Sequence, residues 1–374
     1  MKENEKIYLD NAATAFPKLP EIQDVIKKYC KSFNHSPNRT NGKNILDDVR
    51  EKILKYFDAT DGYEVAFIPT ATIGMNIAIK TLSRDINNQI ITTNCEHHCV
   101  YRPLKEFNTS YKIIEYMDGN QEEHPERILN EMNDETKAII MNHGSNVTGN
   151  IYDLEKIGKQ IKNKDILFIV DISQTAGYDD ISVKNLNADV VVGSAHKHLY
   201  ALPGIGYIIY KKGIKLEPIY YGGTGKLSSN MKQPRVLPDM LETGTMNLLG
   251  ILALEKSIEV ITKEVRKQYR EYENELVNYF VKKSKSISNM NIFCGKESKR
   301  TGVISFKISN LDSNYVVAPY LFQEGNILVR AGLHCAPQIH KTLKTFPEGT
   351  VRISFSHNTK KEEIDKLIDL LKKL

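Results

Sequence analysis

The chain has 374 residues, of which 41% are hydrophobic and 26% are charged, and this ordinary balance excludes disordered and fibrous proteins. Its net charge of +5 is small for this length, and its lysines form no basic stripe with interleaved aromatics, so nothing indicates a nucleic-acid-binding protein. Its five cysteines are an odd number and its N-terminus is charged rather than apolar, which predicts a cytoplasmic protein with free thiols.

Short apolar runs alternate with helical patterns from about residue 60 onward. The runs that we interpret as strands are 63–69, 89–94, 112–116, 137–143, 165–172, 188–194 and 204–210. Helices are expected to begin near Ile73 and to cover residues around 99–107. Because the runs are continuous rather than alternating, they predict strands that are covered on both faces. The succession of strand, helix and strand predicts an α/β fold with a mostly parallel central sheet.

Residues from about 248 to 285 are predicted to form one long amphipathic helix that leads to a smaller domain. The elements expected in that domain are strands at 302–309, 326–331 and 350–356, and helices near 313–325 and from about 359. We therefore predict a large domain over residues 15–255 and a small C-terminal domain over residues 256–374, which the N-terminal segment 1–14 joins.

Polar residues gather where the predicted strands end. They are Thr70 and Thr72, Glu96, His97 and His98, His143 and Asn146, Asp171 and Gln174, and Ser194, His196 and Lys197. Because the carboxyl ends of parallel strands meet at one edge of a sheet, we expect these side chains to converge on one ligand.

Each of these residues alone also has a structural interpretation. A Thr or Asp at such a position is commonly a helix cap or a turn former. The segment "CEHHC" (95–99) lacks the second half of a structural zinc pattern, so we predict no metal site. Cys95 and Cys99 are predicted to be small buried hydrophobic residues.

The group taken together predicts pyridoxal 5′-phosphate (PLP). A lysine can bind an aldehyde cofactor covalently and later move a proton. An aspartate can pair with the ring nitrogen of PLP. Hydroxyls and backbone N–H groups at the start of a helix can hold its phosphate, and an imidazole can stack on its ring.

Segments spread along the chain then form a recognisable set. They are "YLDNAAT" (8–14), "EHH" (96–98), "HGSNVTG" (143–149), "VDISQTAG" (170–177), "SAHKHLYALPGIG" (194–206), "LETGTMN" (241–247) and "RAGLHCAP" (330–337). This set resembles the class V aminotransferase-like, fold-type I PLP enzymes, in the cysteine desulfurase and selenocysteine lyase branch. The resemblance implies the fold-type I PLP-dependent transferase fold, with a large domain and a smaller α+β C-terminal domain.

The resemblance implies roles for the cofactor residues, one residue at a time. Lys197 would be linked to PLP, and Asp171 would face its ring nitrogen. His97 would stack on the ring and take part in catalysis. The other cofactor residues that it implies are Gln174 and Asn146 at the ring hydroxyl, Ala71, Thr72, Ser194 and His196 at the phosphate, and Thr245, which would reach the phosphate of a neighbouring subunit in a homodimer.

The resemblance also implies substrate residues. Arg330 matches the arginine that grips the substrate carboxylate, a group that suits its bidentate fork. Cys335 lies where relatives place the sulfur-accepting nucleophile, with His334 beside it to favour the thiolate. The further substrate residues are Asn146, Arg39, Arg352 and Asn11. The reaction implied converts L-cysteine to L-alanine and passes a persulfide from Cys335 to an acceptor protein or a small thiol.

Three departures from the family pattern bear on the substrate and the acceptor: Ala71 replaces a hydroxyl, Asn38 replaces a histidine before Arg39, and Leu333 stands where many relatives have a histidine. Other functions therefore stay open. They are a selenocysteine lyase, a transaminase or epimerase without sulfur transfer, and a PLP-holding protein that does not turn over substrate.

Overall fold

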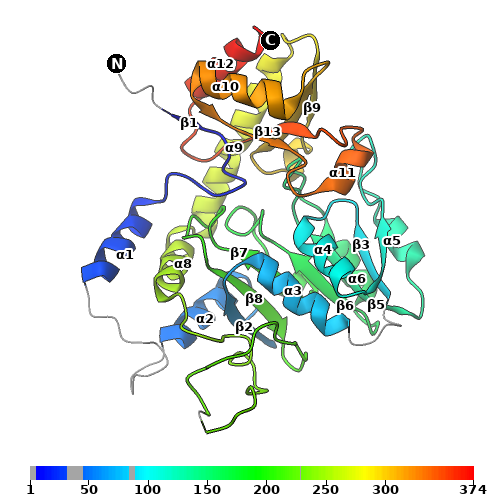
Figure 1. Ribbon diagram of the computed structural model, residues 1–374, viewed down its shortest axis with the longest axis vertical. Coiled ribbons are helices and arrows are strands. Elements are labelled where there is room, and N and C mark those ends of the chain that lie inside the picture. Colours follow the sequence, from blue (N-terminus) through cyan, green and yellow to red (C-terminus); the bar gives the residue numbers. More distant parts are fainter. Residues whose placement is uncertain (1–5, 32–44, 84–88, 228) are drawn as a thin grey trace.

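The computed structural model describes residues 6–31, 45–83, 89–227 and 229–374 (Figure 1). A seven-stranded sheet forms its larger part, in the order β2-β8-β7-β6-β5-β3-β4. The strands are β2 (Tyr63–Ile68), β3 (Gln89–Thr93), β4 (Ser110–Ile114), β5 (Thr136–Asn142), β6 (Leu167–Asp171), β7 (Val190–Ser194) and β8 (Gly206–Lys211). Only β8 runs against its neighbours in this sheet, so the predicted mostly parallel α/β architecture is confirmed.

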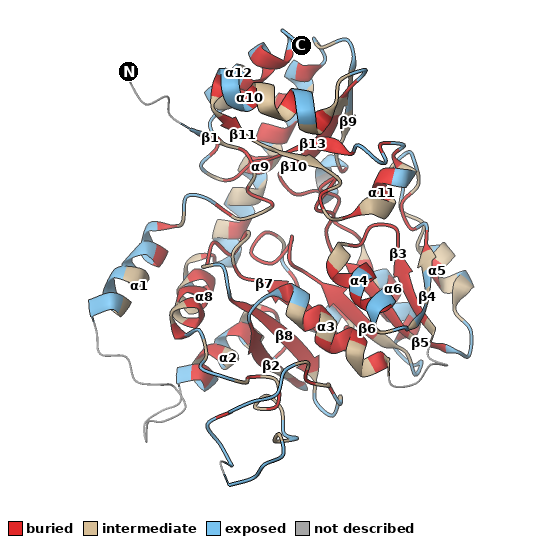
Figure 2. Cartoon of the chain, in the orientation of Figure 1, coloured by how far each residue is buried: buried red, intermediate tan, exposed pale blue. Residues whose placement is uncertain are grey.

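Helices cover both faces of this sheet. They are α1 (Pro20–Lys31), α2 (Ile45–Tyr56), α3 (Ala71–Leu82), α4 (His98–Glu106), α5 (Pro125–Glu131), α6 (Leu154–Ile161) and α7 (Val183–Leu186). Apolar residues of α3 and α4 pack on one face, and those of α2, α6 and α7 pack on the other. Figure 2 shows the central strands buried along their length, which explains why their sequences are continuous apolar runs.

The long helix predicted over residues 248–285 is instead two helices, α8 (Leu248–Val260) and α9 (Lys263–Ser284). The break lies at Ile261 and Thr262, because the Thr262 hydroxyl accepts a hydrogen bond from the backbone N–H of Val265 and so caps a new helix. The predicted domain boundary after residue 255 therefore falls inside α8. We propose that the two domains meet at this helix break.

The C-terminal part contains a four-stranded antiparallel sheet in the order β12-β13-β10-β9. Its elements are β9 (Met290–Phe293), a 3-10 helix (Glu297–Lys299), β10 (Val303–Ile308), a π-helix (Ser313–Val317), α10 (Ala318–Gly325), β12 (Arg330–Gly332), α11 (Pro337–Thr342), β13 (Thr350–Ser354) and α12 (Lys361–Leu371). The strand predicted over 326–331 is split, because β11 (Ile327–Leu328) pairs with the N-terminal strand β1 (Ile7–Tyr8) whereas β12 pairs with β13. This pairing ties the N-terminal segment to the C-terminal part.

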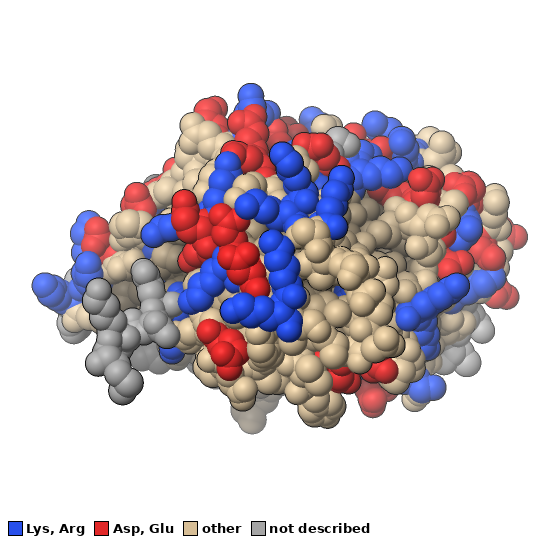
Figure 3. Space-filling model, turned by 90° about the horizontal axis from the view of Figure 1, so that it is seen from above, with Lys and Arg blue, Asp and Glu red and all other residues tan. Residues whose placement is uncertain are grey.

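Charged side chains of both signs mix on the face at this end of the molecule (Figure 3). Ion pairs join its helices, for example Lys283 of α9 and Asp365 of α12 at 3.0 Å. This face is therefore neither uniformly basic nor uniformly acidic. In the described parts of the chain, no helix is long and apolar enough to cross a membrane.

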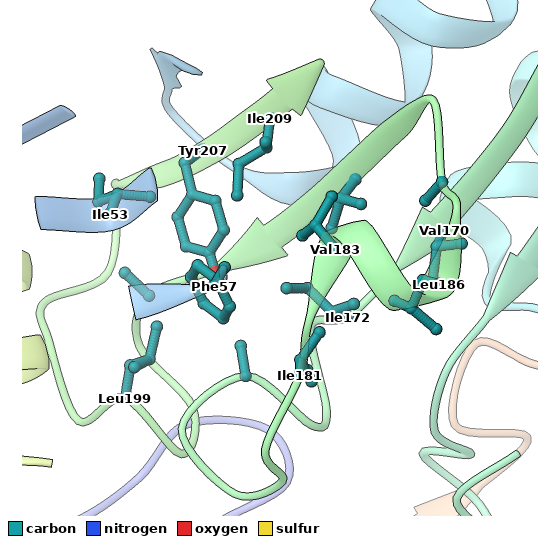
Figure 4. Close-up of a cluster of buried hydrophobic side chains, with 14 of the residues drawn as sticks. Ile53, Phe57, Val170, Ile172, Ile181, Val183, Leu186, Leu199, Tyr207 and Ile209 are labelled. Atoms are coloured by element: carbon teal, nitrogen blue, oxygen red, sulfur yellow. The ribbon is translucent and has the colours of Figure 1, made fainter. Parts of the chain in front are cut away.

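The core beneath the large sheet is made of tightly packed aliphatic and aromatic side chains (Figure 4). Phe57, which follows α2, lies against Tyr207 of β8 with ring centroids 5.3 Å apart. Ile53 and Val183 belong to the same buried cluster. This packing holds one face of the sheet in place, and so it fixes the positions of the residues at the carboxyl ends of its strands.

Candidate active site

A cavity of about 260 Å³ lies where the large sheet's strands end, and residues of the small sheet complete its wall. It brings together most of the predicted site residues: Ala71, Thr72, His97, Asn146, Asp171, Gln174, Ser194, His196, Lys197, Arg330 and Arg352. We call those that precede residue 200 the large-sheet group, and we call Arg330, Arg352 and the adjoining Cys335 the small-sheet group. Thr70 lines the cavity as well, whereas Glu96, His98 and His143 do not, so the predicted convergence at one sheet edge is observed except for these three residues.

Strand ends position the large-sheet group. Asp171 is the last residue of β6 and Ser194 is the last residue of β7, the next strand in the sheet. The Asp171 carboxylate accepts a hydrogen bond at Oδ1 from the backbone N–H of Ser173, at 2.8 Å. The carboxylate thus lines the cavity with Oδ1 already in a hydrogen bond.

Lys197 lies in the turn that follows β7. Three donors from residues 14–18 hold the carbonyl of His196 just before it: the N–H of Ala15 at 3.0 Å, and the Thr14 hydroxyl and the Lys18 amine at 3.2 Å each. Burial lowers the pKa of the Lys197 amine, although the nearby Asp171 charge acts in the opposite direction. A lysine with a lowered pKa is a better base and nucleophile at neutral pH.

The N-terminus of α3 faces the same cavity. The helix begins at Ala71, slightly earlier than predicted, and the Thr70 hydroxyl caps it by accepting from the N–H of Ile73 at 3.3 Å. The first N–H groups of a helix have no partner within the helix, so those of Ala71 and Thr72 are suited to an anion such as phosphate. Because these donors are backbone groups, the missing hydroxyl at Ala71 does not remove them.

His97, the N-cap of α4, also lines the cavity. Its Nδ1 accepts a hydrogen bond from the N–H of Cys99 at 3.0 Å, which leaves the ring proton on Nε2. Burial, followed by the positive charge of Lys197, lowers the pKa of His97 to about 4. The imidazole is therefore neutral near pH 7 and offers a donor at Nε2.

Several buried polar atoms of the cavity residues have no hydrogen-bond partner among the described residues. They are Gln174 Oε1, Asn146 Oδ1, Asn142 Oδ1, Ser173 Oγ and His196 Nδ1. Buried polar atoms are rarely left unpaired in a native protein, so this set points to a polar ligand. A carboxylate, a lysine, a flat imidazole and a helix N-terminus around one small cavity fit the ring and phosphate of PLP.

Arg330 and Arg352 of the small-sheet group differ in their partners. Arg352 of β13 is fully buried, and it donates to the carbonyl of Asn146 at 3.0 Å and to the carboxylate of Asp10 at 2.5 Å. Arg330, the first residue of β12, donates from Nη2 to the Cys335 sulfur at 3.4 Å. Cys335 itself is not a lining residue, but it is half-buried and contacts Arg330, which lines the cavity, so it does not lie in a sealed core.

The turn that carries Cys335 is tied to the large-sheet side of the cavity. His334 and Cys335 have φ angles of 49° and 59°, a left-handed conformation that is costly for residues with a side chain. Two hydrogen bonds of 2.7 Å hold the turn in this conformation: Asn146 Nδ2 donates to the His334 carbonyl, and the N–H of His98 donates to the Cys335 carbonyl. The position of the sulfur is thus set by residues of both groups.

Other predicted residues lie outside the cavity. The Asn11 amide is already engaged, since it donates to the Ser354 carbonyl at 2.9 Å and accepts from the N–H of Phe16 at 3.1 Å. Thr245 is exposed and does not line the cavity. Arg39 and the neighbouring departure at Asn38 fall outside the described residues.

His334 does not assist Cys335 in the way the sequence suggests. Its ring is buried, with Nε2 at 3.0 Å from the Thr350 hydroxyl. Burial, followed by the positive charge of Arg352, holds the pKa of His334 well below its usual value. The imidazole is therefore neutral, and the only cation in hydrogen-bond contact with the sulfur among the described residues is Arg330.

Some lining residues were missed from the sequence. Asn142 and Ser173 each lie beside a predicted residue at a strand end, so their positions were a signal. Asp10, the partner of Arg352, belongs to the "YLDNAAT" segment. Cys99, which was interpreted as a core residue, also lines the cavity.

Comparison with known proteins gives a consistent set of relatives. The profile of the family Aminotransferase class-V matches residues 7–367. A "Cysteine desulfurase" of Wigglesworthia glossinidia brevipalpis is 30% identical over 98% of this chain and 92% of its own, and a "Probable cysteine desulfurase" of Methanothermobacter thermautotrophicus is 26% identical over 98% and 94%. The apo structure of the cysteine desulfurase from Thermococcus onnurineus NA1 superposes with a TM-score of 0.88, at 25% identity, over 99% of this chain and 94% of that one.

Proposed function

Because the chain belongs to the Aminotransferase class-V family, we propose that it is a cysteine desulfurase, an enzyme that converts L-cysteine to L-alanine and retains the sulfur as a persulfide. Its full-length similarity to relatives that carry this name supports the proposal. The single observation that carries it is the contact of Cys335 with Arg330 at the edge of the cavity that contains Lys197.

PLP is the cofactor that we propose for this cavity. Lys197 would carry it, Asp171 would face its ring nitrogen and His97 would stack on its ring. Its phosphate would bind at the N-terminus of α3, and the unpartnered oxygens of Gln174 and Asn146 would serve its ring hydroxyl. When bound, PLP supplies an electron-withdrawing ring that weakens the bonds around the α-carbon of an amino acid.

The substrate's carboxylate is proposed to bind at the small-sheet side of the cavity. Arg330 and Arg352 both line it, and a carboxylate suits the planar fork of a guanidinium. Arg352 already neutralises Asp10, so Arg330 is the cation with more capacity for a second anion. Asn146, the other proposed substrate residue on this side, lines the cavity next to Arg352, which donates to its backbone carbonyl at 3.0 Å.

Proton transfer falls to groups of the large-sheet side. The lowered pKa of Lys197 favours the neutral form of the amine, the form that can take the proton from the substrate's α-carbon. His97 is neutral with its proton on Nε2, so it can donate a hydrogen bond there but is not a proton source near pH 7. The hydrogen bond from the N–H of Cys99 fixes that tautomer.

Sulfur transfer falls to Cys335. Its thiolate attacks the sulfur of the substrate, so that an S–S bond forms as the substrate's C–S bond breaks. The substrate's carbon takes the electron pair of the broken bond and a proton, and it leaves as alanine. Cys335 keeps the added sulfur as a persulfide, which a protein thiol or a small thiol then removes.

A second copy of the chain is proposed to cover the loop between β8 and α8. Tyr221 and Met231 in this loop are exposed by 61% and 100%, although both are large apolar residues. Thr245 lies near the end of the same loop and is exposed, as a residue that serves a partner's cavity would be before assembly. The molecular mass in solution, measured by light scattering, tests this arrangement.

The Cys335→Ser variant tests the proposed reaction. The PLP-loaded protein is expected to form alanine from L-cysteine without any 2-oxo acid, and a persulfide on the peptide that contains Cys335. The variant should keep the absorbance of bound PLP but form alanine at least about 100-fold more slowly. The Cys30→Ser variant, which changes an exposed cysteine on α1, is the matched control and should behave as the wild type.

Other outcomes would assign a different reaction. Full turnover of L-cysteine by the Cys335→Ser variant would rule out the nucleophile. Turnover of selenocysteine without turnover of cysteine would indicate a selenocysteine lyase, and a requirement for a 2-oxo acid would indicate a transaminase.

A further inference from the structure

Two buried cysteines of one short segment have different surroundings. Cys95 is 1% exposed, belongs to the apolar core, and lies with its sulfur 3.4 Å from Asn94 Oδ1. Cys99 is 5% exposed, lines the cavity, and lies with its sulfur 3.6 Å from Asp171 Oδ2. Both are small buried residues of the apolar core, as predicted, but Cys99 alone also lines the cavity.

Cys99 is placed by the same turn that places His97. Its backbone N–H donates to His97 Nδ1, and its side chain points from the second residue of α4 towards the end of β6. One residue thus contacts both the imidazole and the carboxylate that flank the predicted ring position. Neither contact could be read from the spacing of "CEHHC".

The Cys99 thiol is suited to donate rather than to accept. Burial and the negative charge of Asp171 raise the pKa of Cys99 well above its usual value, so the sulfur keeps its proton. A thiol is a weak donor in general, but a carboxylate is a strong acceptor that gains from any donor in a buried site. Asp171 Oδ1 already accepts from Ser173, so the thiol holds the second oxygen and fixes the plane of the carboxylate.

We propose that Cys99 is a positioning residue whose S–H group orients Asp171 toward the ring nitrogen of PLP. The inference rests on the proposed cofactor and adds a residue to its site. Without the thiol, the carboxylate is held at one oxygen only and can turn about its side-chain bonds. PLP then binds only when the carboxylate happens to point toward its ring nitrogen. Fixing the carboxylate in that orientation costs conformational entropy, which lowers the affinity for PLP.

The test compares Cys99→Ala, Cys99→Ser and Cys95→Ala in the full-length protein. The cofactor is removed and PLP is titrated back, with its dissociation constant and its absorbance spectrum measured across neutral pH. Cys99→Ala is expected to weaken PLP binding about three- to tenfold and to shift the pH at which the absorbance band changes. Cys99→Ser keeps a donor and should stay within about twofold of the wild type.

Cys95→Ala is the matched control, because it removes a thiol of similar burial from the same segment. The Cys95 sulfur contacts Asn94, which does not line the cavity, and alanine keeps the backbone carbonyl that accepts from the lining residue Asn142 at 2.8 Å. It is expected to leave PLP affinity and absorbance unchanged, whatever it does to thermal stability. Unaltered affinity and spectrum in Cys99→Ala would overturn the inference. An effect of Cys99→Ser as large as that of Cys99→Ala would overturn it too, since packing alone would then explain the result.

The same measurements separate this inference from the proposed function. PLP binding that follows the expected order, without alanine formation from L-cysteine, would overturn the proposed reaction and leave the role of Cys99 supported. Absence of PLP binding by the wild type would overturn both.

Discussion

The two sides of the cavity are built in different ways. The large-sheet group stands on consecutive strand ends and helix starts, where regular hydrogen bonding and a packed core fix each backbone position. The small-sheet group includes a left-handed turn at His334 and Cys335 that is held by side-chain and backbone contacts from across the cavity. The first side is suited to hold a cofactor rigidly, and the second side is suited to present a reactive sulfur.

This difference shows that one cavity can meet two requirements on separate sides: fixed positions for a cofactor and access for a nucleophile. A cofactor needs several groups at fixed positions, which a sheet edge supplies at little extra cost. A nucleophile that receives sulfur and then passes it on needs access, which a half-buried turn supplies. Variants on the two sides should therefore fail in different ways.

Lys197→Ala should give the largest effect. It removes both the attachment point for the cofactor and the base, so alanine formation from L-cysteine should fall at least about 1,000-fold. The small-sheet side should be unaffected, so the rate at which iodoacetamide modifies Cys335 in the cofactor-free protein should stay within about twofold. Lys159→Ala, an exposed position on α6, is the control for loss of a lysine. A Cys335 modification rate that falls in parallel with activity would show that the two sides are not separable.

Arg330→Gln should give the next largest effect. In contrast to Lys197→Ala, it should impair substrate binding at the small-sheet side and leave the binding of PLP intact. Loss of a charge-assisted contact with the substrate's carboxylate should lower kcat/KM about 100-fold. PLP affinity should stay within about twofold, because Arg330 belongs to the small-sheet group. Steady-state kinetics and PLP titration measure the two quantities. Lys341→Gln, an exposed cation on α11, should change neither, and a parallel loss of PLP affinity in Arg330→Gln would contradict the separation.

His97→Asn should give the smallest effect, on the pH dependence of stability of the cofactor-free protein. The pKa of His97 is about 4 in the folded state and near 6.5 when unfolded, so the unfolded state binds the proton first as the pH falls between these values. This contribution to stability is present above pH 6.5 and is lost on acidification, with a slope of about 1 kcal/mol per pH unit.

Asparagine keeps the helix cap but does not titrate, so the variant should show a flatter curve of unfolding free energy against pH in urea denaturation. His124→Asn is the control, because Asp118 raises the pKa of that surface histidine and gives its contribution the opposite sign. A curve for His97→Asn that is as steep as that of the wild type would show that His97 is not held neutral.

The sequence determined the parts of the protein that local patterns encode. Continuous apolar runs predicted the strands of the large sheet, and the polar residues at their ends predicted the cavity, because parallel strands carry their carboxyl ends to one edge. Asp171, Ser194 and Lys197 were found in this way. The predicted role of Cys335 as the nucleophile rested on the resemblance to a family, because no periodicity or spacing in the sequence indicates it.

Only the tertiary structure decided what depends on contacts between distant segments. The helix predicted over 248–285 breaks at Thr262, where a local cap outweighs the amphipathic pattern. The strand predicted over 326–331 divides between two sheets because β1 arrives from the other end of the chain. Cys95 and Cys99 look alike in the sequence and both pack in the apolar core, yet only the Cys99 sulfur contacts Asp171. A sequence specifies which groups are available, whereas the directions of side chains on packed elements specify which of them meet.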